Sequence, residues 1–477
     1  MVLSWAKKQR LVLKMYYEIP GKKSTEVLKK GPLLSRGGMS YFSEAEDAEK
    51  KGFQVKPPQF INGKAEGSWI YDLDGNRYMD FHAGWASNPF GNSNPEIIEA
   101  VYSAMKTWGF SYEHPLQYEL AEVLAEITPG QKLTRVNFEI SGTEAAEAAV
   151  STALVHKERP LIIAFEDSFH GDSIGARGLS ALTSDRSKYF ESWRGGVIHV
   201  PYPHTFDIPA GMNAEQYADY ILWYIDEFVC RKVVSPDMIA GILLEPCMAE
   251  GGNWIPTDNF ITGIQEVARK HDWLIIADEV LVGLGRTGKM WAVDHWNFIP
   301  DLLVIGKNLS GGVEPIAAIA GTEEVMRDTE VHSGSTYAGS PAGCAAALKT
   351  LEMYKRDKIV ERTENLGKKV MERLNRWTQE FSIVGQVRGL GLLLGASIVD
   401  SETKKPRKDL SMAVYQEALK RGAWIINDDE ANIRLYPALN VEEDALDTGL
   451  TAVEEALRAV EKKNYRVNIY PEYPNFD

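Results

Sequence analysis

Short apolar runs of four to six residues, most of them rich in Ile, Leu, Val or Ala, recur through the middle of the chain. Several are separated by longer stretches in which apolar residues have helical spacing. The runs are Arg135–Ile140, Leu161–Phe165, Gly196–Val200, Ile239–Leu244, Leu274–Ala277, Leu302–Ile305 and Ala317–Ala320. Strands that alternate with helices are typical of α/β proteins. The sequence therefore predicts a mostly parallel seven-stranded sheet sandwiched by helices.

The stretch from Leu274 to Gly312 carries a charged residue at the end of each of two predicted strands. Asp278 follows the run LIIA, and Lys307 follows the run LLVIG. Parallel strands end at one edge of a sheet, where open α/β folds bind their ligands. A buried carboxylate and ammonium are costly unless they are paired or used. Both a structural ion pair and a functional pair fit this pattern.

Both ends of the chain depart from the alternation. The segment GSWIYDLDGNRYMDF, Gly67–Phe81, alternates apolar and polar residues around a tight turn and predicts a β-hairpin. A helical stretch from Ala342 to about Glu380, a strand with glycine kinks in VRGLGLLLGASIV, and a last helix from Glu442 predict a smaller α+β domain. The predicted division is an N-terminal arm and hairpin packed with the small domain (1–85), a large domain (86–338) and the small domain (339–477).

Composition excludes several classes of partner. The formal net charge is −15, from 52 Lys and Arg against 67 Asp and Glu, which argues against nucleic acid or an anionic membrane surface. The three cysteines are widely separated and match neither a disulfide framework nor a metal site. The N-terminus lacks the features of a signal peptide, and no run approaches the ~18–20 apolar residues that span a bilayer. We expect a cytoplasmic protein without a metal.

The segment Ser141-Gly142-Thr143 follows a predicted strand and opens an Ala-rich helix. Free backbone N–H groups and the helix dipole make such a helix start suitable for a phosphate. Gly142 would allow close approach, and Thr143 would add a hydroxyl. An ordinary helix cap formed by Thr143 fits equally well. Neither a G-x-G-x-x-G motif at the first strand nor a P-loop is present, so nucleotide binding is poorly supported.

A phosphate seat, a carboxylate for an aromatic nitrogen and a lysine for an aldehyde match the groups of pyridoxal 5′-phosphate (PLP). The chain resembles the class III (ω-aminotransferase) family of fold-type I PLP enzymes from its hairpin to its last helix. The matching motifs are SGTEA at 141–145, FHGDS at 169–173, EPCMAEGG at 245–252, ADEVLVGLGRTG at 277–288, PDLLVIGKN at 300–308 and GSTYAGSP at 334–341.

The resemblance implies a role for each residue around the cofactor ring. Lys307 would hold PLP as an internal aldimine and carry the proton during catalysis. Asp278 would face the pyridine nitrogen. Val280 and Phe169 would pack on opposite faces of the ring, with Phe169 in a place often held by tyrosine.

The resemblance also implies the phosphate contacts and an assembly. Gly142 and Thr143 would bind the phosphate, and Thr336 would reach the phosphate of the partner subunit. The implied active site therefore lies at the interface of a homodimer.

Four further positions bear on the substrate. Glu250 and Arg434 match a family pair in which the arginine binds either the glutamate or a substrate α-carboxylate; a surface ion pair is the alternative. Asp172 stands where 4-aminobutyrate enzymes tend to carry arginine, so a substrate with a distal carboxylate is disfavoured; Asp172 could also be a helix cap. Trp85 falls where the family places an aromatic residue in the substrate pocket, or it packs in the core.

The sequence departs from the family pattern at Leu281 and Met248, which replace glutamines, and at Asn92 and Asn94, where histidines are common. These departures leave the cofactor residues intact but weaken any inference about the substrate. The resemblance implies an aminotransferase that acts on an amine or amino acid and on a keto acid or aldehyde. A racemase, epimerase or aminomutase on the same scaffold is the alternative, with Glu250 as a second acid or base. A PLP-binding protein without activity is a third reading.

Overall fold

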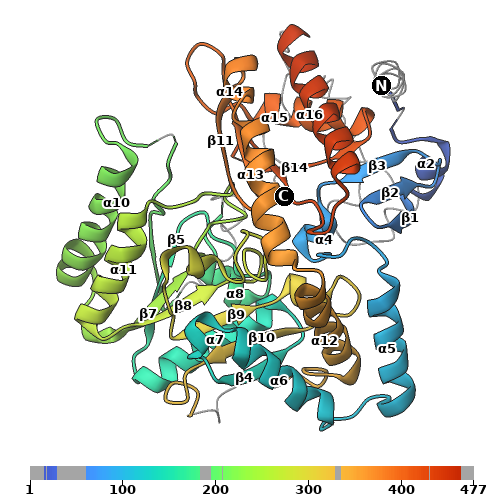
Figure 1. Cartoon of the computed structure of the whole chain (residues 1–477). Coiled ribbons are helices and arrows are strands. Elements are labelled where there is room, and N and C mark those ends of the chain that lie inside the picture. Colours follow the sequence, from blue (N-terminus) through green and yellow to red (C-terminus); the bar gives the residue numbers. More distant parts are fainter. Residues whose placement is uncertain are drawn as a thin grey trace.

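A seven-stranded sheet forms the centre of the large part of the molecule in a computed structural model (Figure 1). The model describes residues 16–17, 19–28, 61–182, 195–206, 208–327, 335–428 and 430–463. The strands lie in the order β4 (Arg135–Glu139), β10 (Ala317–Gly321), β9 (Leu302–Ile305), β8 (Leu274–Asp278), β7 (Ile239–Leu244), β5 (Leu161–Phe165) and β6 (Val197–Val200). Strand β10 is antiparallel to both of its neighbours, and the other neighbouring pairs are parallel. The predicted sheet is confirmed.

Helices cover this sheet, and α7 lies closest to its centre. Helix α7 packs against β7, β8, β9 and β10, and its buried face is built from alanines that let helix and sheet approach closely. The helices of the large part are α4 (Ala83–Ala86), α5 (Pro95–Trp108), α6 (Pro115–Ile127), α7 (Gly142–Lys157), α8 (Ile174–Leu179), α10 (Ala214–Trp223), α11 (Asp258–His271) and α12 (Pro341–Arg356). In Figure 1, α10 and α11 lie at one end of the sheet and α5 lies at the other.

Short helical turns complete the large part. They are η3 (Pro129–Gln131), η5 (Tyr224–Val233), η6 (Pro236–Met238), η7 (Ala292–Trp296) and η8 (Lys307–Ser310). The connection from β8 to β9 contains only the turn η7.

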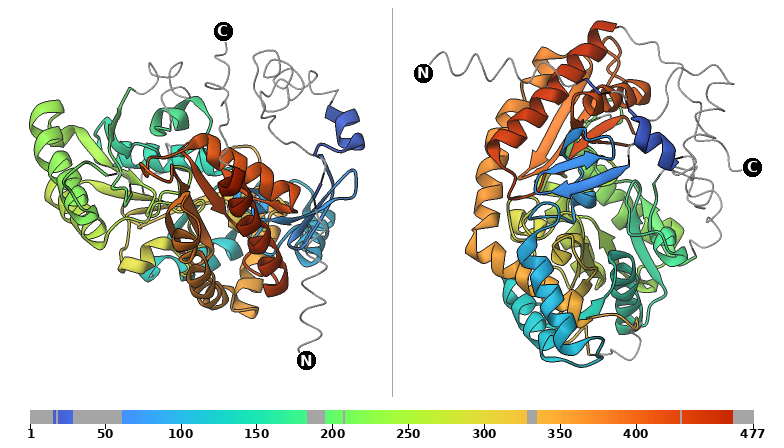
Figure 2. Two further views of the ribbon diagram at one scale, coloured as in Figure 1. Left: turned by 90° about the horizontal axis from the view of Figure 1, so that it is seen from above. Right: turned by 90° about the vertical axis from the view of Figure 1, so that its right-hand side faces the viewer.

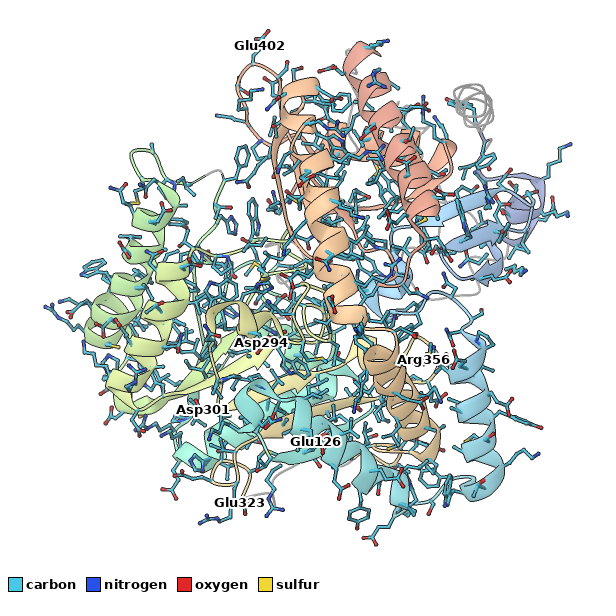
Figure 3. The ribbon with its side chains drawn as sticks, viewed as in Figure 1. Glu126, Asp294, Asp301, Glu323, Arg356 and Glu402 are labelled. Carbon is cyan, nitrogen blue, oxygen red and sulfur yellow. The ribbon has the colours of Figure 1, made fainter. Side chains whose placement is uncertain are left out.

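Helix α5 shows how local sequence sets the helix ends. Asn94 accepts hydrogen bonds from the N–H groups of Glu96 and Ile97, Pro95 occupies the first turn, and Gly109 ends the helix. Arg356, labelled in Figure 3, lies at the end of α12 and forms a two-pronged ion pair with Glu96. This contact joins the ends of two helices that are far apart in the sequence.

The C-terminal part contains an antiparallel sheet and four helices. The sheet has the order β11 (Val384–Leu390), β12 (Leu393–Ile398), β15 (Asn432–Leu435) and β14 (Ile426–Asn427). The helices are α13 (Ile359–Leu374), α14 (Trp377–Glu380), α15 (Lys408–Lys420) and α16 (Glu443–Lys463). The segment VRGLGLLLGASIV forms a hairpin and not one strand, because Gly391 turns the chain with a φ of +54°. The helical stretch after Ala342 is likewise broken into three helices, the first break lying at Lys358 with a φ of 48°.

The N-terminal hairpin joins the C-terminal part. Strands β2 (Trp69–Asp72) and β3 (Arg77–Asp80) form the predicted hairpin, flanked by β1 (Asn62–Glu66) and preceded by α2 (Lys22–Leu28). Strand β3 pairs in parallel with β13 (Ala423–Trp424), so the blue hairpin lies beside the red C-terminal helix in Figure 2. Most of the predicted N-terminal arm lies outside the described residues. Within the described part of the chain, none of the helices is both long and apolar enough to cross a membrane.

Candidate active site

Asp278 and Lys307 lie at the same edge of the large sheet. Asp278 ends β8 and stands in register with Val304 of β9, and Lys307 follows β9 after one glycine. The Asp278 side chain is buried: its Oδ2 lies 2.7 Å from Nδ1 of His170, and its Oδ1 accepts a hydrogen bond from the Val280 N–H. These contacts fix the orientation of the carboxylate toward the strand edge.

Lys307 begins the turn η8 with a φ of 42°, a left-handed conformation that is uncommon for a residue with a side chain. Strained backbone of this kind concentrates at functional sites. Burial lowers the pKa of Lys307, and the carboxylates of Glu250 and Asp278 oppose that shift. Lys307 is therefore an amine that gives up its proton more easily than a surface lysine.

The N-terminus of α7 lies beside these two residues. Ser141 caps the helix by accepting a hydrogen bond from the Glu144 N–H, so the alternative in which Thr143 is the cap is wrong. Gly142 and Thr143 are the first residues of the helix, and their N–H groups have no acceptor within it. A Cβ atom on Gly142 would lie 2.8 Å from Cγ1 of Val280, so any larger residue at position 142 would collide with Val280.

The loop after β5 is tied to the loop after β7 by a buried carboxylate. Oε1 of Glu245 accepts a hydrogen bond from the Phe169 N–H, and its Oε2 accepts one from the Ala249 N–H. Burial raises the pKa of Glu245, and His170 opposes the shift. The roles of Glu245 and His170 were not predicted, although the two residues stand in the motifs EPCMAEGG and FHGDS, respectively.

Arg434 and Glu250 form a direct pair. Arg434 lies on β15 and is fully buried, and its Nη1 donates to Oε2 of Glu250 at 2.8 Å and to the Ala249 carbonyl at 3.2 Å. Burial opposes the charge, but Tyr436, Glu250 and Asp428 together raise the pKa of Arg434 above its usual range. The surface ion pair considered for Arg434 is therefore wrong.

Trp85 lies on a left-handed turn. Residues 83–86 all have positive φ, and three of them carry side chains. The Asp80 carboxylate holds this turn by accepting hydrogen bonds from the N–H groups of His82 and Ala83 and from Nδ2 of Asn92. Asn92, which stands where relatives often carry histidine, thus has a structural role. Trp85 remains 45% exposed, so it is not a core residue in this chain.

A pocket of about 370 Å³ brings the substrate candidates together. Trp85, Glu250 and Arg434 all line it. The other lining residues are His82, Asp167, Leu182, Gly251, Lys408, Met412, Tyr415, Trp424, Ile425, Ile426, Asn427, Asp428 and Glu430. Most of these come from the C-terminal part, including α15 and the hairpin of β14 and β15.

Neither Asp172 nor Thr336 lines this pocket, and the predicted cofactor residues are also absent from its lining. Asp172 is exposed and forms an ion pair with Arg177 at 3.2 Å; the cap of α8 is Ser173, so the helix-cap alternative for Asp172 is wrong. Thr336 is exposed on the loop before α12. The carbonyl of Gly339 anchors that loop by accepting hydrogen bonds from Gln117 and from Nε2 of His114.

Comparisons with known proteins agree with this geometry. The family model described as "Aminotransferase class-III" matches residues 53–457. The chain belongs to the class III aminotransferase family. A probable 4-aminobutyrate aminotransferase of Bacillus subtilis (strain 168) is 32% identical over 85% of this chain and 97% of that protein. An alanine/serine racemase of Pyrococcus horikoshii is 29% identical over 86% of this chain and 89% of that protein.

A solved structure has the same fold. The omega transaminase of Pseudomonas jessenii, determined in complex with PMP, superposes with a TM-score of 0.80 at 27% identity, over 87% of this chain and 98% of that chain. The fold is therefore that of a fold-type I PLP transaminase. This class III aminotransferase uses PLP as its cofactor.

The residues of this chain fit PLP. A carboxylate on one strand end, an amine of lowered pKa on the next, and a helix start with free N–H groups supply partners for the ring nitrogen, the aldehyde and the phosphate. The tight contact between Gly142 and Val280 brings the helix start close to the strand edge. All three partners lie within one short stretch of the sheet edge.

Proposed function

We propose that this aminotransferase moves an amino group between an amine or amino acid and a keto acid or aldehyde, with Lys307 and Asp278 as its catalytic residues. The observation that carries the proposal is the register of β8 and β9, which sets Asp278 opposite Val304, three residues before Lys307. When bound, PLP acts as an electron sink that makes the proton on the substrate carbon beside the nitrogen acidic. Lys307 Nζ takes that proton, and its lowered pKa favours the neutral form that can accept it.

The neighbouring residues hold the cofactor in place. Asp278, oriented by His170, would stabilise a positive charge on the ring nitrogen. Val280 and Phe169 would contact the two faces of the ring. The backbone N–H groups of Gly142 and Thr143 would bind the phosphate.

The geometry of Glu250 favours transamination over racemisation. A racemase needs a second acid or base on the face opposite Lys307. Oε2 of Glu250 instead accepts a hydrogen bond from Arg434, whose raised pKa keeps it charged. A carboxylate that is engaged by a permanent cation is not free to act as a proton donor on the opposite face.

A spectroscopic assay separates the two reactions. The PLP-loaded protein is incubated without a keto acid with single-enantiomer amino acids and with amines that lack a carboxylate. We expect conversion of the cofactor to its amine form with one equivalent of carbonyl product. Loss of enantiomeric purity while the cofactor keeps its aldehyde form would identify a racemase. No change with any compound would identify a protein without activity.

A homodimer with the active site at its interface is part of the proposal. Exposed aromatic residues gather between α5 and the loop that carries Thr336, and the Phe110 ring lies 4.9 Å from that of Tyr337 and 5.3 Å from that of Tyr112. Apolar patches of this kind mark protein–protein contacts. A second copy covering the patch would bring its own Thr336 to the phosphate site of the first.

A charge placed in this patch tests the dimer. Phe110→Asp should shift the mass measured by light scattering toward that of a monomer and lower transaminase activity at least about tenfold, since a carboxylate is costly to bury. Phe228→Asp is the matched control, because Phe228 is an exposed aromatic on η5. A wild-type protein that is monomeric and fully active would contradict the proposal.

The proposed function includes a division into domains, two residues that limit the substrate, and a location in the cell. The pairing of β3 with β13 supports the predicted unit of residues 1–85 and 339–477 beside a large unit of 86–338, except that α12 packs against α5 and α6 and so belongs with the large unit. A role for Asp172 against substrates with a distal carboxylate stays a prediction, because its side chain does not line the pocket. Trp85, which does line the pocket, would limit the size of the group that enters it. Free cysteines at 230, 247 and 344 support a reducing, cytoplasmic location.

A further inference from the structure

Arg434 lies between two carboxylates. Glu250 meets its Nη1 at 2.8 Å, and Oδ2 of Asp428 lies 3.5 Å from its Nε. Glu250 comes from the loop after β7, whereas Asp428 follows β14, whose residue Ile426 pairs with Arg434 across the hairpin. The guanidinium thus has one carboxylate from the large part of the molecule and another from its own hairpin.

Asp428 is fixed in place by the turn that it begins. Its Oδ1 accepts hydrogen bonds from the backbone N–H groups of Glu430 and Asn432, each at 2.9 Å, and from the Asn432 side chain at 3.2 Å. Its side chain is only 6% exposed. Oδ2 has no hydrogen-bond partner among the described residues, and it faces the Arg434 guanidinium. Burial raises the pKa of Asp428, and the Arg434 charge opposes the shift.

Glu250 is held differently. Its side chain is 20% exposed and it borders the pocket that Trp85 and Arg434 also line. A ligand carboxylate that binds Arg434 has to replace Glu250, which can move into the pocket. It cannot replace Asp428 without breaking the turn.

Among the described residues that line the pocket, Lys408 is the other permanently cationic side chain besides Arg434. His82 also lines the pocket, and burial lowers its pKa to about 4, so it is neutral at pH 7. Asp167 is paired with His204 at 3.1 Å. Lys408 and Glu430, which also line the pocket, carry opposite charges.

We propose that Asp428 is a specificity-determining residue: a fixed second counter-ion of Arg434 that shifts the preferred substrates toward amines and carbonyl compounds with no carboxylate next to the reacting carbon. The inference rests on the aminotransferase function proposed above. When Glu250 moves away, Asp428 still compensates the Arg434 charge. The binding free energy that an incoming carboxylate gains from Arg434 is therefore smaller than it would be from an arginine without a counter-ion. An amine without a carboxylate leaves both pairs intact.

Binding of pyruvate to the PLP-loaded protein tests this inference without turnover, because no amine is present. Asp428→Asn retains the Oδ1 acceptor of the turn but removes the charge. We expect the Kd for pyruvate, measured by calorimetry, to fall about tenfold. Glu430→Gln, which removes one charge from the same pocket wall, is the matched control and should change the Kd by less than about twofold. A Kd that is unchanged or higher in Asp428→Asn would overturn the inference.

Two further variants make the result independent of a folding defect. Asp428→Ser also retains an acceptor for the turn and should tighten pyruvate binding in the same direction. Adding Arg434→Met to Asp428→Asn should abolish the increase in pyruvate affinity, because that increase depends on the Arg434 guanidinium. An increase that survives in the double variant would contradict the proposed route.

Kinetics supply a second readout. In Asp428→Asn, kcat/KM for L-alanine should rise about tenfold, while kcat/KM for 1-phenylethylamine stays within about twofold. Equal changes for both substrates would count against a role in specificity. If Asp428→Asn does not change pyruvate binding, the inference about Asp428 is wrong but the proposed aminotransferase function is unaffected. If the amine assay identifies a racemase, the proposed function is wrong but the pyruvate binding measurement still tests the role of Asp428.

Discussion

In the proposed cofactor half of the site, Asp278 and Lys307 lie at the ends of the neighbouring strands β8 and β9, and the start of α7 lies beside them. The proposed substrate half, formed by Trp85, Glu250, Asp428 and Arg434, is assembled from segments that are far apart in the sequence. The first half is tied together by strand register and by short contacts to buried groups. The second depends on how the hairpin of β14 and β15 and the turn at 83–86 pack against the loop after β7.

This difference separates chemistry from selectivity. Strand ends in a parallel sheet are rigid and adjacent, so they can hold a proton carrier and a ring partner in a constant geometry. Loops and turns from different parts of the chain can change one residue at a time without disturbing the sheet. We therefore expect substitutions in the cofactor half to abolish activity toward all substrates. Substitutions in the substrate half should instead change the relative activity toward different substrates.

The largest effect should come from Lys307→Ala. Transamination should fall at least about 10³-fold, because the proton carrier is lost. Reduction with borohydride should also no longer join the cofactor to the chain, as judged by mass spectrometry. Lys270→Ala, which alters a surface lysine paired with Asp226, should change neither result. A reducible lysine adduct that persists in Lys307→Ala would show that another residue has this role.

The cofactor half is also the part that sequence predicts well. The strands β5, β7 and β9 have the predicted bounds, since apolar runs of this length have few other uses in an α/β protein. Once the strands are known, their ends place Asp278 and Lys307 at one edge without any knowledge of distant contacts. His170 could have been found in the same way, because it follows Phe169 in a quoted motif.

The substrate half could not be predicted to the same depth. Asp428 matters only because the register of β14 and β15 brings it to Arg434, and that register depends on a hairpin with two-residue strand β14. The left-handed turn around Trp85 contains alanines, which carry no sequence signal for positive φ. The hairpin at Gly391 was missed because a glycine inside an apolar run predicts a kink as readily as a turn.

His82 lines the pocket of the proposed substrate half, and its effect should be intermediate. Its ring stacks on Trp424 at 4.5 Å, and its Nδ1 accepts a hydrogen bond from the Trp85 N–H. Burial, reinforced by Arg434 and opposed by Glu250, lowers its pKa to about 4. The unfolded-state value is about 6.5, so the stability from the neutral ring is present above about pH 6.5 and is lost as pH falls through 4.

His82→Asn removes this titration and retains an acceptor for the Trp85 N–H. Between pH 7 and pH 4, the wild type should lose about 3 kcal/mol more free energy of unfolding than the variant. Urea unfolding at both pH values measures the difference, with each protein referred to its own value at pH 7. Equal losses in the two proteins would show that His82 is not buried in its neutral form.

The smallest effect should come from Trp85 and is resolved by comparing two variants. Trp85 has a φ of 57° and a ψ of 47°, where glycine is relaxed and other residues are strained. Trp85→Gly and Trp85→Ala both remove the ring contact with His82, but only glycine relieves the backbone. Trp85→Gly should therefore be more stable than Trp85→Ala by about 1 kcal/mol. Both variants should accept amines with bulkier substituents, measured as a rise in kcat/KM of several-fold. If alanine were as stable as glycine, the left-handed turn would not store strain, and the selectivity of the pocket would depend on the size of the indole ring alone.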